Sequence, residues 1–591
     1  MHLRAALLVF GALTAFSLAA LASSRRGATP ARSLPNQGAV VTIATQSNPS
    51  TPIDAQFKGK LPITDLSEEE AAAHVLNRLG YGPRPGDVER IKQMGLEKWI
   101  DLQLHPERLD DSRVQARLKQ FPVLGMGAQS LLAQYPRPEE AAKREGISID
   151  EYRKRMDALA HPPQGVRPPP NTQPQEVLNE IQQAKVLRTL YSERQLEQQL
   201  TDFWFNHFNV FAYKDLDEWL LTPYERDAIR PHVLGKFRDL LEATARSPAM
   251  LFYLDNYLSA DPQSFDRLKH LPPQKHPRSN SQLPPLGGKR GLNENYGREL
   301  LELHTLGVDG GYTQQDVIEV ARCFTGWTIR DLRTNPEFYF DERIHDPDPK
   351  RVLGKKIHAG GMKDGEQVLD LLVKTPRTAH HIAFELAQHF VSDAPPEPLV
   401  QRMAKSFQKS GGDVREVMRT MIYSPEFWSR DTYRAKVKRP FELVASTARA
   451  LGADVDDAGP LVGWVGRIGE PLYQCQPPTG YSDKAEAWVN TGALLNRLNY
   501  AIALASNRVR GSQVQLTPLL GSDAMDDPYQ ALDRAVNTFL AGQASETTRA
   551  TLEREASDPK VAKAAFPGGA KRADLGVITG LVLGAPEFQR R

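Results

Sequence analysis

The sequence predicts an all-α protein, a large irregular multi-helix domain with at most one small β-hairpin. Apolar residues recur mainly with the 3.6-residue period of a helix, and the strict apolar–polar alternation of a half-buried strand is almost absent. A chain of 591 residues with 40% hydrophobic and 25% charged residues has the size and composition of a globular protein with a large core. These observations exclude a fibrous or wholly disordered chain.

Residues 1–22 predict a secretory signal peptide. One Arg is followed by an apolar run and then by small residues that end at Ala22. No Arg pair precedes the run and no Cys follows it, which favours the general secretory route over the twin-arginine and lipoprotein routes. An uncleaved membrane anchor is the alternative. We therefore expect a periplasmic or secreted protein with no membrane span after signal cleavage.

The segment 23–62 is rich in Ser, Thr, Pro, Gly and Ala and predicts a disordered linker. The helical domain is expected over 63–591, with Pro-rich loops near 161–175 and 259–287. Ser67 precedes three glutamates and predicts the first helix cap. Helices are expected at about 67–78, 86–94, 95–104, 174–190, 193–208, 234–246, 294–306, 313–325, 364–373, 376–391, 396–409, 412–422, 437–451, 489–505, 527–541 and 574–583. The segment 338–357 predicts a short hairpin.

Charge and missing motifs exclude several classes of function. Lys and Arg number 74 against 72 Asp and Glu, so no overall field favours a nucleic acid partner. The chain lacks a P-loop, a dinucleotide-binding GxGxxG after a strand and a CxxCH site, so neither a nucleotide nor a haem cofactor is expected. It also lacks the GxSxG turn of serine hydrolases.

Several segments, in the same order along the chain, resemble one bacterial family. They read HVLNRLGYGPRPGDVERI, LTDFWFNHFNVF, NENYGRELLELHTLGVDGGYTQQDVIEVARCFTGWT, HDPDPKRVLG, HFVSD, KRPFELV and PPTGY followed by WVNTGALLNR. They are similar to the exported family catalogued as domain of unknown function 1800. The resemblance implies a helical fold, a location in the envelope or outside the cell, and an exported sulfatase-like protein as a candidate partner. It implies no catalytic residue.

One predicted helix in 291–330 carries a stripe of polar side chains. Asn295, Glu299 and Glu302 share one face, because residues spaced by four and three positions stack on a helix. His304 falls on the opposite face, so this helix alone does not form a zinc site.

A second predicted helix carries a matching stripe of Asp202, Asn206 and Asn209 among aromatic residues. If the two stripes face each other, their carboxylates need Arg298 and Arg322, or a hard divalent cation such as Ca²⁺, Mg²⁺ or Mn²⁺. His345, Asp346 and Asp348, on a loop with two prolines, are placed to complete such a site.

These stripes define the candidate site residues. Glu299, Glu302 and Asp202 are the candidate catalytic groups, as general acid and base. The candidate binding residues are Asn206, Asn295, Arg298, Arg322 and His345, and the candidate metal ligands are Asp202, Glu299, Glu302 and Asp346. The alternative is a buried structural network, in which Glu299 pairs with Arg298 or Arg322.

Three further groups of residues are weaker candidates. His380 is followed by His381, Glu385 and His389, which stack on one helix face at metal-ligand spacing. Asp255 and Asn256 are expected to border a cleft. Cys323 and Cys475 either form a disulfide or are separate buried thiols.

The sequence therefore favours an exported cell-envelope protein of undefined activity, an accessory or binding protein that works with an envelope partner. The alternative function is a carboxylate- or divalent-metal-dependent hydrolase that acts on an envelope or extracellular polymer. A purely structural helical scaffold is a third hypothesis.

Overall fold

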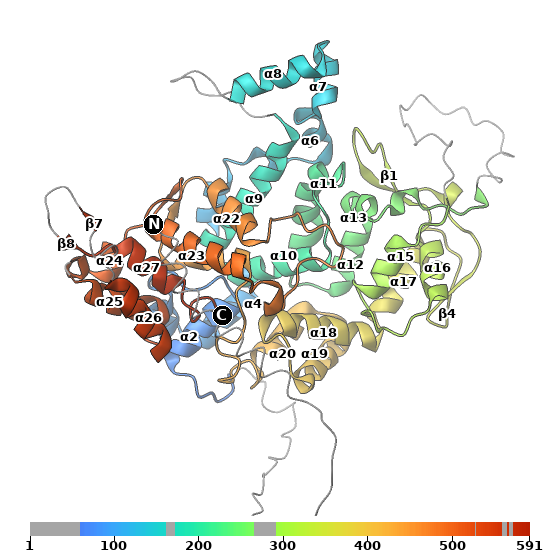
Figure 1. The fold of residues 1–591 in the computed structure, drawn as a ribbon. Coiled ribbons are helices and arrows are strands. Elements are labelled where there is room, and N and C mark those ends of the chain that lie inside the picture. The colour runs from blue at the N-terminus through green and yellow to red at the C-terminus, as the bar shows by residue number, and fades with distance from the viewer. Residues whose placement is uncertain (1–59, 161–171, 265–290, 526, 558–563, 566–570) are drawn as a thin grey trace, which may run out of the picture.

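The computed structural model describes residues 60–160, 172–264, 291–525, 527–557, 564–565 and 571–591 (Figure 1). The expected signal peptide, the linker up to residue 59 and most of both Pro-rich stretches lie outside these residues. Within them the fold is all-α, as predicted, and helices make up nearly all of the regular structure.

The helices before residue 265 are α2 (Glu68–Arg78), α3 (Asp87–Met94), α4 (Leu96–Leu104), α5 (Ser112–Leu118), α6 (Ala128–Gln134), α7 (Pro138–Glu145), α8 (Ile149–Ala160), α9 (Pro174–Tyr191), α10 (Gln195–His207), α11 (Asp217–Pro223), α12 (Phe237–Arg246) and α13 (Pro248–Tyr253). The later ones are α15 (Asn295–Glu302), α16 (Gln314–Cys323), α17 (Lys363–Val373), α18 (Pro376–Phe390), α19 (Glu397–Ser410), α20 (Val414–Ile422), α21 (Pro440–Ala450), α22 (Gly459–Ile468), α23 (Thr491–Ala505), α24 (Thr517–Leu520), α25 (Pro528–Leu540), α26 (Glu546–Ala556) and α27 (Leu575–Leu583).

The strands form four antiparallel pairs within the described residues, whereas the sequence predicts at most one hairpin. The pairs are β1 (Trp327–Arg330) with β2 (Glu337–Phe340), β3 (Lys350–Val352) with β4 (Lys355–Ile357), β5 (Asp454–Val455) with β6 (Ser512–Gln513), and β7 (Ala564–Ala565) with β8 (Lys571–Arg572). The expected hairpin at 338–357 is thus divided. Its first residues belong to β2 and pair with the preceding strand β1, and only its last residues form a hairpin, from β3 and β4. Strands of two to four residues give too little periodicity to be recognised in the sequence.

Two helix starts follow directly from local sequence. Ser67 caps α2, and its hydroxyl accepts from the Glu70 N–H while the Glu70 carboxylate accepts from the Ser67 N–H. Thr313 and Asp316 make the same reciprocal pair at the start of α16. The cap at Ser67 matches the sequence prediction.

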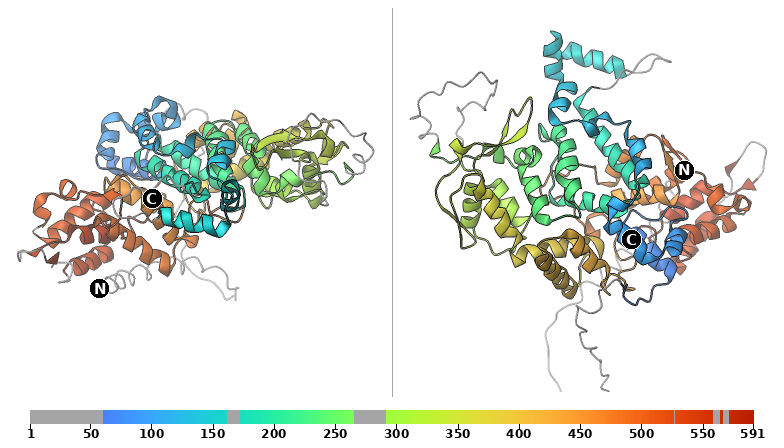
Figure 2. Two further views of the ribbon diagram at one scale, coloured as in Figure 1. Left: turned by 90° about the horizontal axis from the view of Figure 1, so that it is seen from above. Right: turned by 180° about the vertical axis from the view of Figure 1, so that it is seen from behind.

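One connected apolar core runs from Leu66 to Phe588. Helices α9 and α10 lie centrally, and α24–α27 and the α15–α17 region lie at opposite ends of the molecule (Figures 1 and 2). Helices α7 and α8 project from the body and enclose a small separate cluster of Ala141, Ala142 and Tyr152. No helix among the described residues is both long and apolar enough to traverse a lipid bilayer.

Helices α23 and α27 pack closely because α27 presents glycines to α23. A Cβ added to Gly580 would lie 2.5 Å from the Ile502 Cα, and one added to Gly576 would lie 2.8 Å from the Ser506 Cα. Both neighbours are backbone atoms, which cannot move aside as a flexible side chain does. This contact positions the end of α23 against the start of α27.

Gly580→Ala tests this contact. We expect the substitution to lower the free energy of unfolding by about 1–3 kcal/mol, because the added methyl group overpacks a helix crossing. The measurement is the urea unfolding midpoint of the purified protein.

Gly463→Ala in α22 is the matched control, since a Cβ at Gly463 meets nothing within 4 Å. There the higher helix propensity of Ala predicts a gain of up to about 1 kcal/mol. Equal stability of the two variants would contradict the proposed close packing.

Candidate functional site

Asp202, in the middle of α10, lies in a buried ion network. Its carboxylate pairs with the Lys185 Nζ of α9 at 2.5 Å and with the Arg439 guanidinium, which precedes α21. All three side chains are buried. Burial raises the pKa of Asp202, but Lys185 and Arg439 outweigh burial and hold the pKa below its usual value. Asp202 is therefore an ionised counter-ion for two cations, which is a poor state for a proton donor.

Arg439 extends the network to the segment after α22. Its Nε lies 3.5 Å from Glu470 and its Nη1 lies 3.9 Å from Asp483. The Asp483 carboxylate is 2.8 Å from the His389 Nδ1 on α18. Burial raises the pKa of Glu470 to about 7, whereas His389 and Arg439 overcome burial and lower the pKa of Asp483. The network thereby connects α9, α10, α18 and α21.

The segment 589–591 is joined to the same region. Arg591 pairs with Glu442 at 2.8 Å, and its N–H donates to the Lys436 carbonyl at 2.8 Å. Lys436 in turn pairs with Asp393 at 2.7 Å. The network therefore depends on residues separated by up to 406 positions, from Lys185 to Arg591.

The remaining residues of the α10 stripe hold a loop. The Asn206 side-chain amide donates to the Tyr481 carbonyl at 2.8 Å and accepts from the Tyr481 N–H at 2.7 Å. The Asn209 Nδ2 donates to the carbonyls of Cys475 and Pro477 at 2.9 and 2.8 Å. The amides of Asn206 and Asn209 are therefore engaged by the backbone of the 471–483 loop.

A glycine makes the approach of this loop feasible. Gly480 has φ +68, and a Cβ there would lie 2.4 Å from the Asn206 carbonyl oxygen. Only a residue without a side chain fits between the two segments. The glycine of the PPTGY motif is thus explained by its contact with α10.

Asn295 and Arg298 of α15 have partners near the start of the helix. The Asn293 side chain accepts from the Asn295 N–H at 2.9 Å, and Asn295 itself is exposed. Arg298 pairs with Glu294 at 3.1 Å and donates to Gln314 at 2.9 Å. The expected pairing of Arg298 or Arg322 with Glu299 is not what the structure shows, since both arginines bind other groups.

Glu299 and Glu302 form the half-buried acidic part of this helix. Glu302 accepts from the Tyr312 hydroxyl at 3.1 Å. Burial, followed by the charge of Glu302, raises the pKa of Glu299. The Tyr253 hydroxyl donates to the Gln476 carbonyl at 2.7 Å. The pKa of Tyr253 is raised by burial first, and then by the charges of Cys475, Asp217 and Glu299. Glu299 therefore raises the pKa of Tyr253, and Tyr253 binds the 471–483 loop. Asn206 and Asn209 hold the same loop.

Arg322, His345 and Asp346 come together at a different place. Arg322 binds both oxygens of Asp346, at 2.7 and 3.2 Å, and Glu319 at 2.8 Å. The His345 Nδ1 bonds the Thr325 carbonyl at 2.7 Å. Burial raises the pKa of Asp346, but Arg322 outweighs it and keeps the pKa low. This cluster fastens the 345–350 loop to α16, and Asp346 has no contact with Asp202.

The predicted histidine face of α18 is divided between two clusters. Glu385 lies 2.6 Å from the His207 Nδ1 and 3.5 Å from the His381 Nε2. His389 instead belongs to the network of Asp202 through Asp483. His304 is buried beside His207, and burial holds its pKa well below the usual value. His380 is half-buried and pairs with Glu397 at 3.0 Å.

No group of three or more His, Cys, Asp or Glu residues is placed to hold a metal ion within the described part of the chain. Asp202 and Asp346, two of the predicted ligands, lie in separate networks, each with its own arginine. Cys323 and Cys475 are buried free thiols. Asp255 pairs with Lys214 at 2.8 Å, and Asn256 donates to the carbonyls of Phe324 and Trp327.

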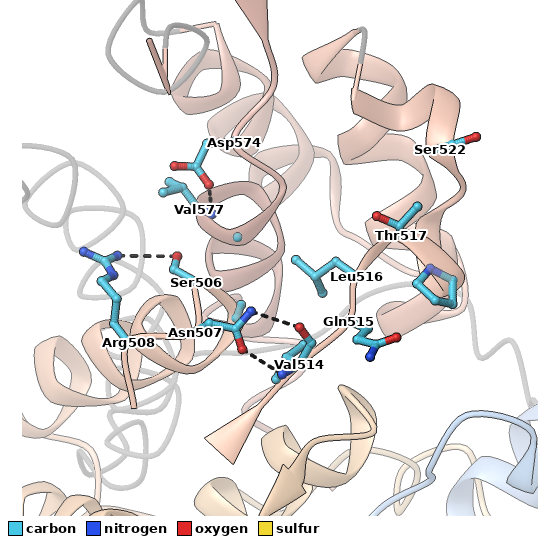
Figure 3. Close-up of a pocket in the computed structure, with 13 residues that line it drawn as sticks. Ser506, Asn507, Arg508, Val514, Gln515, Leu516, Thr517, Ser522, Asp574 and Val577 are labelled. Atoms are coloured by element: carbon cyan, nitrogen blue, oxygen red, sulfur yellow. Dashed lines mark hydrogen bonds between the residues drawn. The ribbon is translucent and has the colours of Figure 1, made fainter. Parts of the chain in front are cut away.

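An open cavity lies between the end of α23, α24 and the start of α27 (Figure 3). It has a volume of about 1180 Å³. Asn507 fixes one wall through two hydrogen bonds with the Val514 backbone, and Asp574 caps α27 at the Val577 N–H. The lining residues are Ala505, Ser506, Asn507, Arg508, Val514, Gln515, Leu516, Thr517, Pro518, Ser522, Asp574, Gly576 and Val577.

Several polar groups of this cavity are available to a ligand. Gln515, Thr517 and Ser522 are exposed, and their side chains make no hydrogen bond with the residues that the structure describes. The sequence gives no sign of this site, because 506–522 has neither a motif nor a periodic pattern. Helix periodicity likewise gives no reason to select Lys185, Arg439 or Glu470 as site residues, although Arg439 lies in the KRPFELV segment.

The fold and the buried network define a helical protein whose charged centre joins segments from most of the chain. The family model described as "Protein of unknown function (DUF1800)" matches residues 74–590, and the chain belongs to this family. Neither the curated proteins nor the solved structures include a match.

Asp202→Asn tests whether the network is structural. We expect a loss of about 3 kcal/mol or more in the free energy of unfolding at pH 7, because two buried cations lose their counter-charge. Asp370→Asn is the control: Asp370 is exposed and pairs with Arg238 on the surface, so we expect a change within about 1 kcal/mol.

The pH dependence follows from the lowered pKa of Asp202. The contribution of Asp202 to the free energy of unfolding is complete above about pH 3.9, where an unfolded Asp is ionised. This contribution is lost as the pH falls through the lower pKa of the folded state. The advantage of the wild type over Asp202→Asn should therefore persist from neutral pH down to about pH 4. Unfolding curves with nearly equal midpoints at pH 7 would refute the structural role.

Proposed function

We propose that this protein is an exported binding protein of the bacterial cell envelope, which holds a polar polymer in the cavity between α23, α24 and α27. The observation that carries the proposal is the set of unbonded amide and hydroxyl groups of Gln515, Thr517 and Ser522 in that cavity. Such groups donate and accept hydrogen bonds, as a polyhydroxylated or amide-bearing ligand requires. The cavity is also open to solvent, so a ligand can enter it from outside.

The lining favours binding over cleavage. It contains one carboxylate, Asp574, which already caps α27 through the Val577 N–H. Hydrolysis of a glycosidic bond generally uses two carboxyl groups, one as acid and one as base or nucleophile. Asp202, the other predicted catalytic carboxylate, is ion-paired in the buried network.

Export and partnership complete the proposal. The N-terminal pattern of one Arg, an apolar run and small residues supports secretion to the periplasm or beyond. An accessory role, in which the protein presents a bound polymer to an exported sulfatase-like enzyme, accords with the absence of a paired acid and base in the cavity lining.

A second candidate function is supported by Glu299. Its raised pKa, caused by burial and then by Glu302, is the property that a general acid needs near neutral pH. Under this alternative the acidic face of α15 hydrolyses an envelope or extracellular polymer, with Glu302 as the second carboxylate. The 471–483 loop would then border the substrate.

The binding proposal is tested by co-sedimentation with purified peptidoglycan sacculi. The Thr517→Val, Ser522→Ala double variant removes two hydroxyl groups, and we expect binding to weaken about tenfold, since each hydrogen bond contributes about 0.5–1.5 kcal/mol. Thr547→Val is the matched control, because Thr547 is exposed on α26 outside the cavity lining. Identical binding by the wild type and the double variant would exclude this cavity.

The hydrolase alternative is tested by the release of soluble fragments from the same sacculi. If Glu299 is the acid, Glu299→Gln should reduce release at least about a hundredfold. Release by the wild type should also fall as the pH rises through the raised pKa of Glu299, because the acid must be protonated. Equal release by the wild type and Glu299→Gln would exclude the acidic face of α15 as the catalytic site.

A further inference from the structure

Lys438 borders a second cavity, on the other side of α24. The cavity has a volume of about 440 Å³, within the range of small-molecule sites. Pro518 lines both cavities, so α24 forms a shared wall. Lys438 opens the KRPFELV segment, directly before the Arg439 that binds Asp202, and only 4% of its surface is exposed.

The two neighbouring cations of this segment have opposite surroundings. Arg439 is bound to Asp202 and lies near Glu470. The Lys438 Nζ instead lies 3.9 Å from the centroid of the Phe588 ring and, within the described residues, contacts neither a carboxylate nor a hydrogen-bond acceptor. Its backbone N–H donates to the Gln589 carbonyl at 2.9 Å, which fixes its position beside the cavity. The N–H donors of Lys438 are therefore available to an acceptor that enters the cavity.

The charges around Lys438 are mainly positive. Burial, followed by the charge of Arg434, lowers the pKa of Lys438 to about 7, and Arg591 and Arg497 act in the same direction. Glu442 opposes them, but its carboxylate pairs with Arg591 at 2.8 Å. The amine is therefore poised to gain a proton when a negative charge arrives.

The walls of the cavity suit an anion with an apolar body. Arg434 and Arg590 contribute positive charge, against Glu89 and Glu587. Arg84 also lines the wall, but its guanidinium pairs with Asp87 and Glu193. Glu587 is engaged elsewhere, since it accepts from the Ser545 N–H at 2.9 Å and from the Thr548 hydroxyl at 3.2 Å.

The apolar part of the wall comes from both ends of the domain. Pro85 and Val88 lie on one side, and Leu519, Phe539 and Phe588 come from the region after α23. These side chains contact hydrocarbon favourably when water is displaced.

We propose that this cavity binds a small organic anion, whose carboxylate or phosphate group contacts the Lys438 Nζ and whose apolar part packs against Phe588, Phe539 and Leu519. Binding brings a proton to Lys438, because the bound anion stabilises the ammonium form. This site is separate from the proposed polymer cavity, and neither proposal depends on the other.

The test is isothermal titration of the full secreted chain with octanoate at pH 6.5. We expect octanoate to bind at least tenfold more tightly than acetate, because the longer chain fills the apolar part of the cavity. Octyl phosphate in place of octanoate shows which anionic group the site prefers. Absence of binding by both octyl ligands would overturn the proposal.

Lys438→Met retains the length of the side chain and removes its charge. We expect at least a tenfold loss of octanoate affinity, and the circular dichroism spectrum checks that the variant is folded. Thr538→Trp is a second variant, which fills the cavity from the exposed face of α25 while Lys438 stays intact, and it should also lose binding. Lys363→Met, on the exposed surface of α17, is the matched control and should bind as the wild type does.

The pH dependence provides an independent readout. With a free pKa of about 7 for Lys438, octanoate should bind about 25-fold more weakly at pH 8.5 than at pH 6.5, since a proton must then be taken up. The arginines around the site stay charged over this range. Unchanged affinity in Lys438→Met, or equal affinity at the two pH values, would overturn the assignment of Lys438 as the anion-binding group.

Discussion

The structure depends on the pairing of buried charges around Asp202. Lys185, Asp202 and Arg439 come from α9, α10 and the start of α21, and each is shielded from water. An isolated charge in such surroundings costs several kcal/mol, so these helices must pack in the arrangement that neutralises all three groups. Asp483, His389 and Glu470 extend the same requirement to α18 and to the 471–483 loop. Packing and electrostatics therefore select one tertiary arrangement together.

This use of the central charges explains where ligands are expected to bind. The charged groups of the network around Asp202 pair with one another, so they leave little capacity for chemistry at that place. Unbonded polar groups also line the cavities around α24, with the hydroxyl-lined cavity on one side and Lys438 on the other. Arg439 and Lys438 illustrate the division within two consecutive residues, since one has its anion in the fold and the other faces a cavity.

Helices with a clear apolar period were predictable, and helices without one were not. The expected helix at 174–190 is α9 (Pro174–Tyr191), and that at 376–391 is α18 (Pro376–Phe390). Helices α7 (Pro138–Glu145) and α8 (Ile149–Ala160) were not predicted, because they are highly charged and bury only a small cluster. Helix α22 (Gly459–Ile468) was also not predicted, since its glycines lower helix propensity and only packing compensates. Tertiary contacts override weak local preferences at such positions.

The sequence by itself determined the helical class, the cap at Ser67 and the position of Asp202 and Asn206 one turn apart on one helix, because these depend on neighbours within one or two helical turns. It did not determine what each stripe faces. Asn206 meets Tyr481, 275 positions away, and Asp202 meets Arg439, 237 positions away. Periodicity specifies the direction of a side chain on its own helix, but only the packed chain brings its distant partner opposite. The tertiary structure therefore decided that Asp202 is a counter-ion and that Lys438 is left facing a cavity.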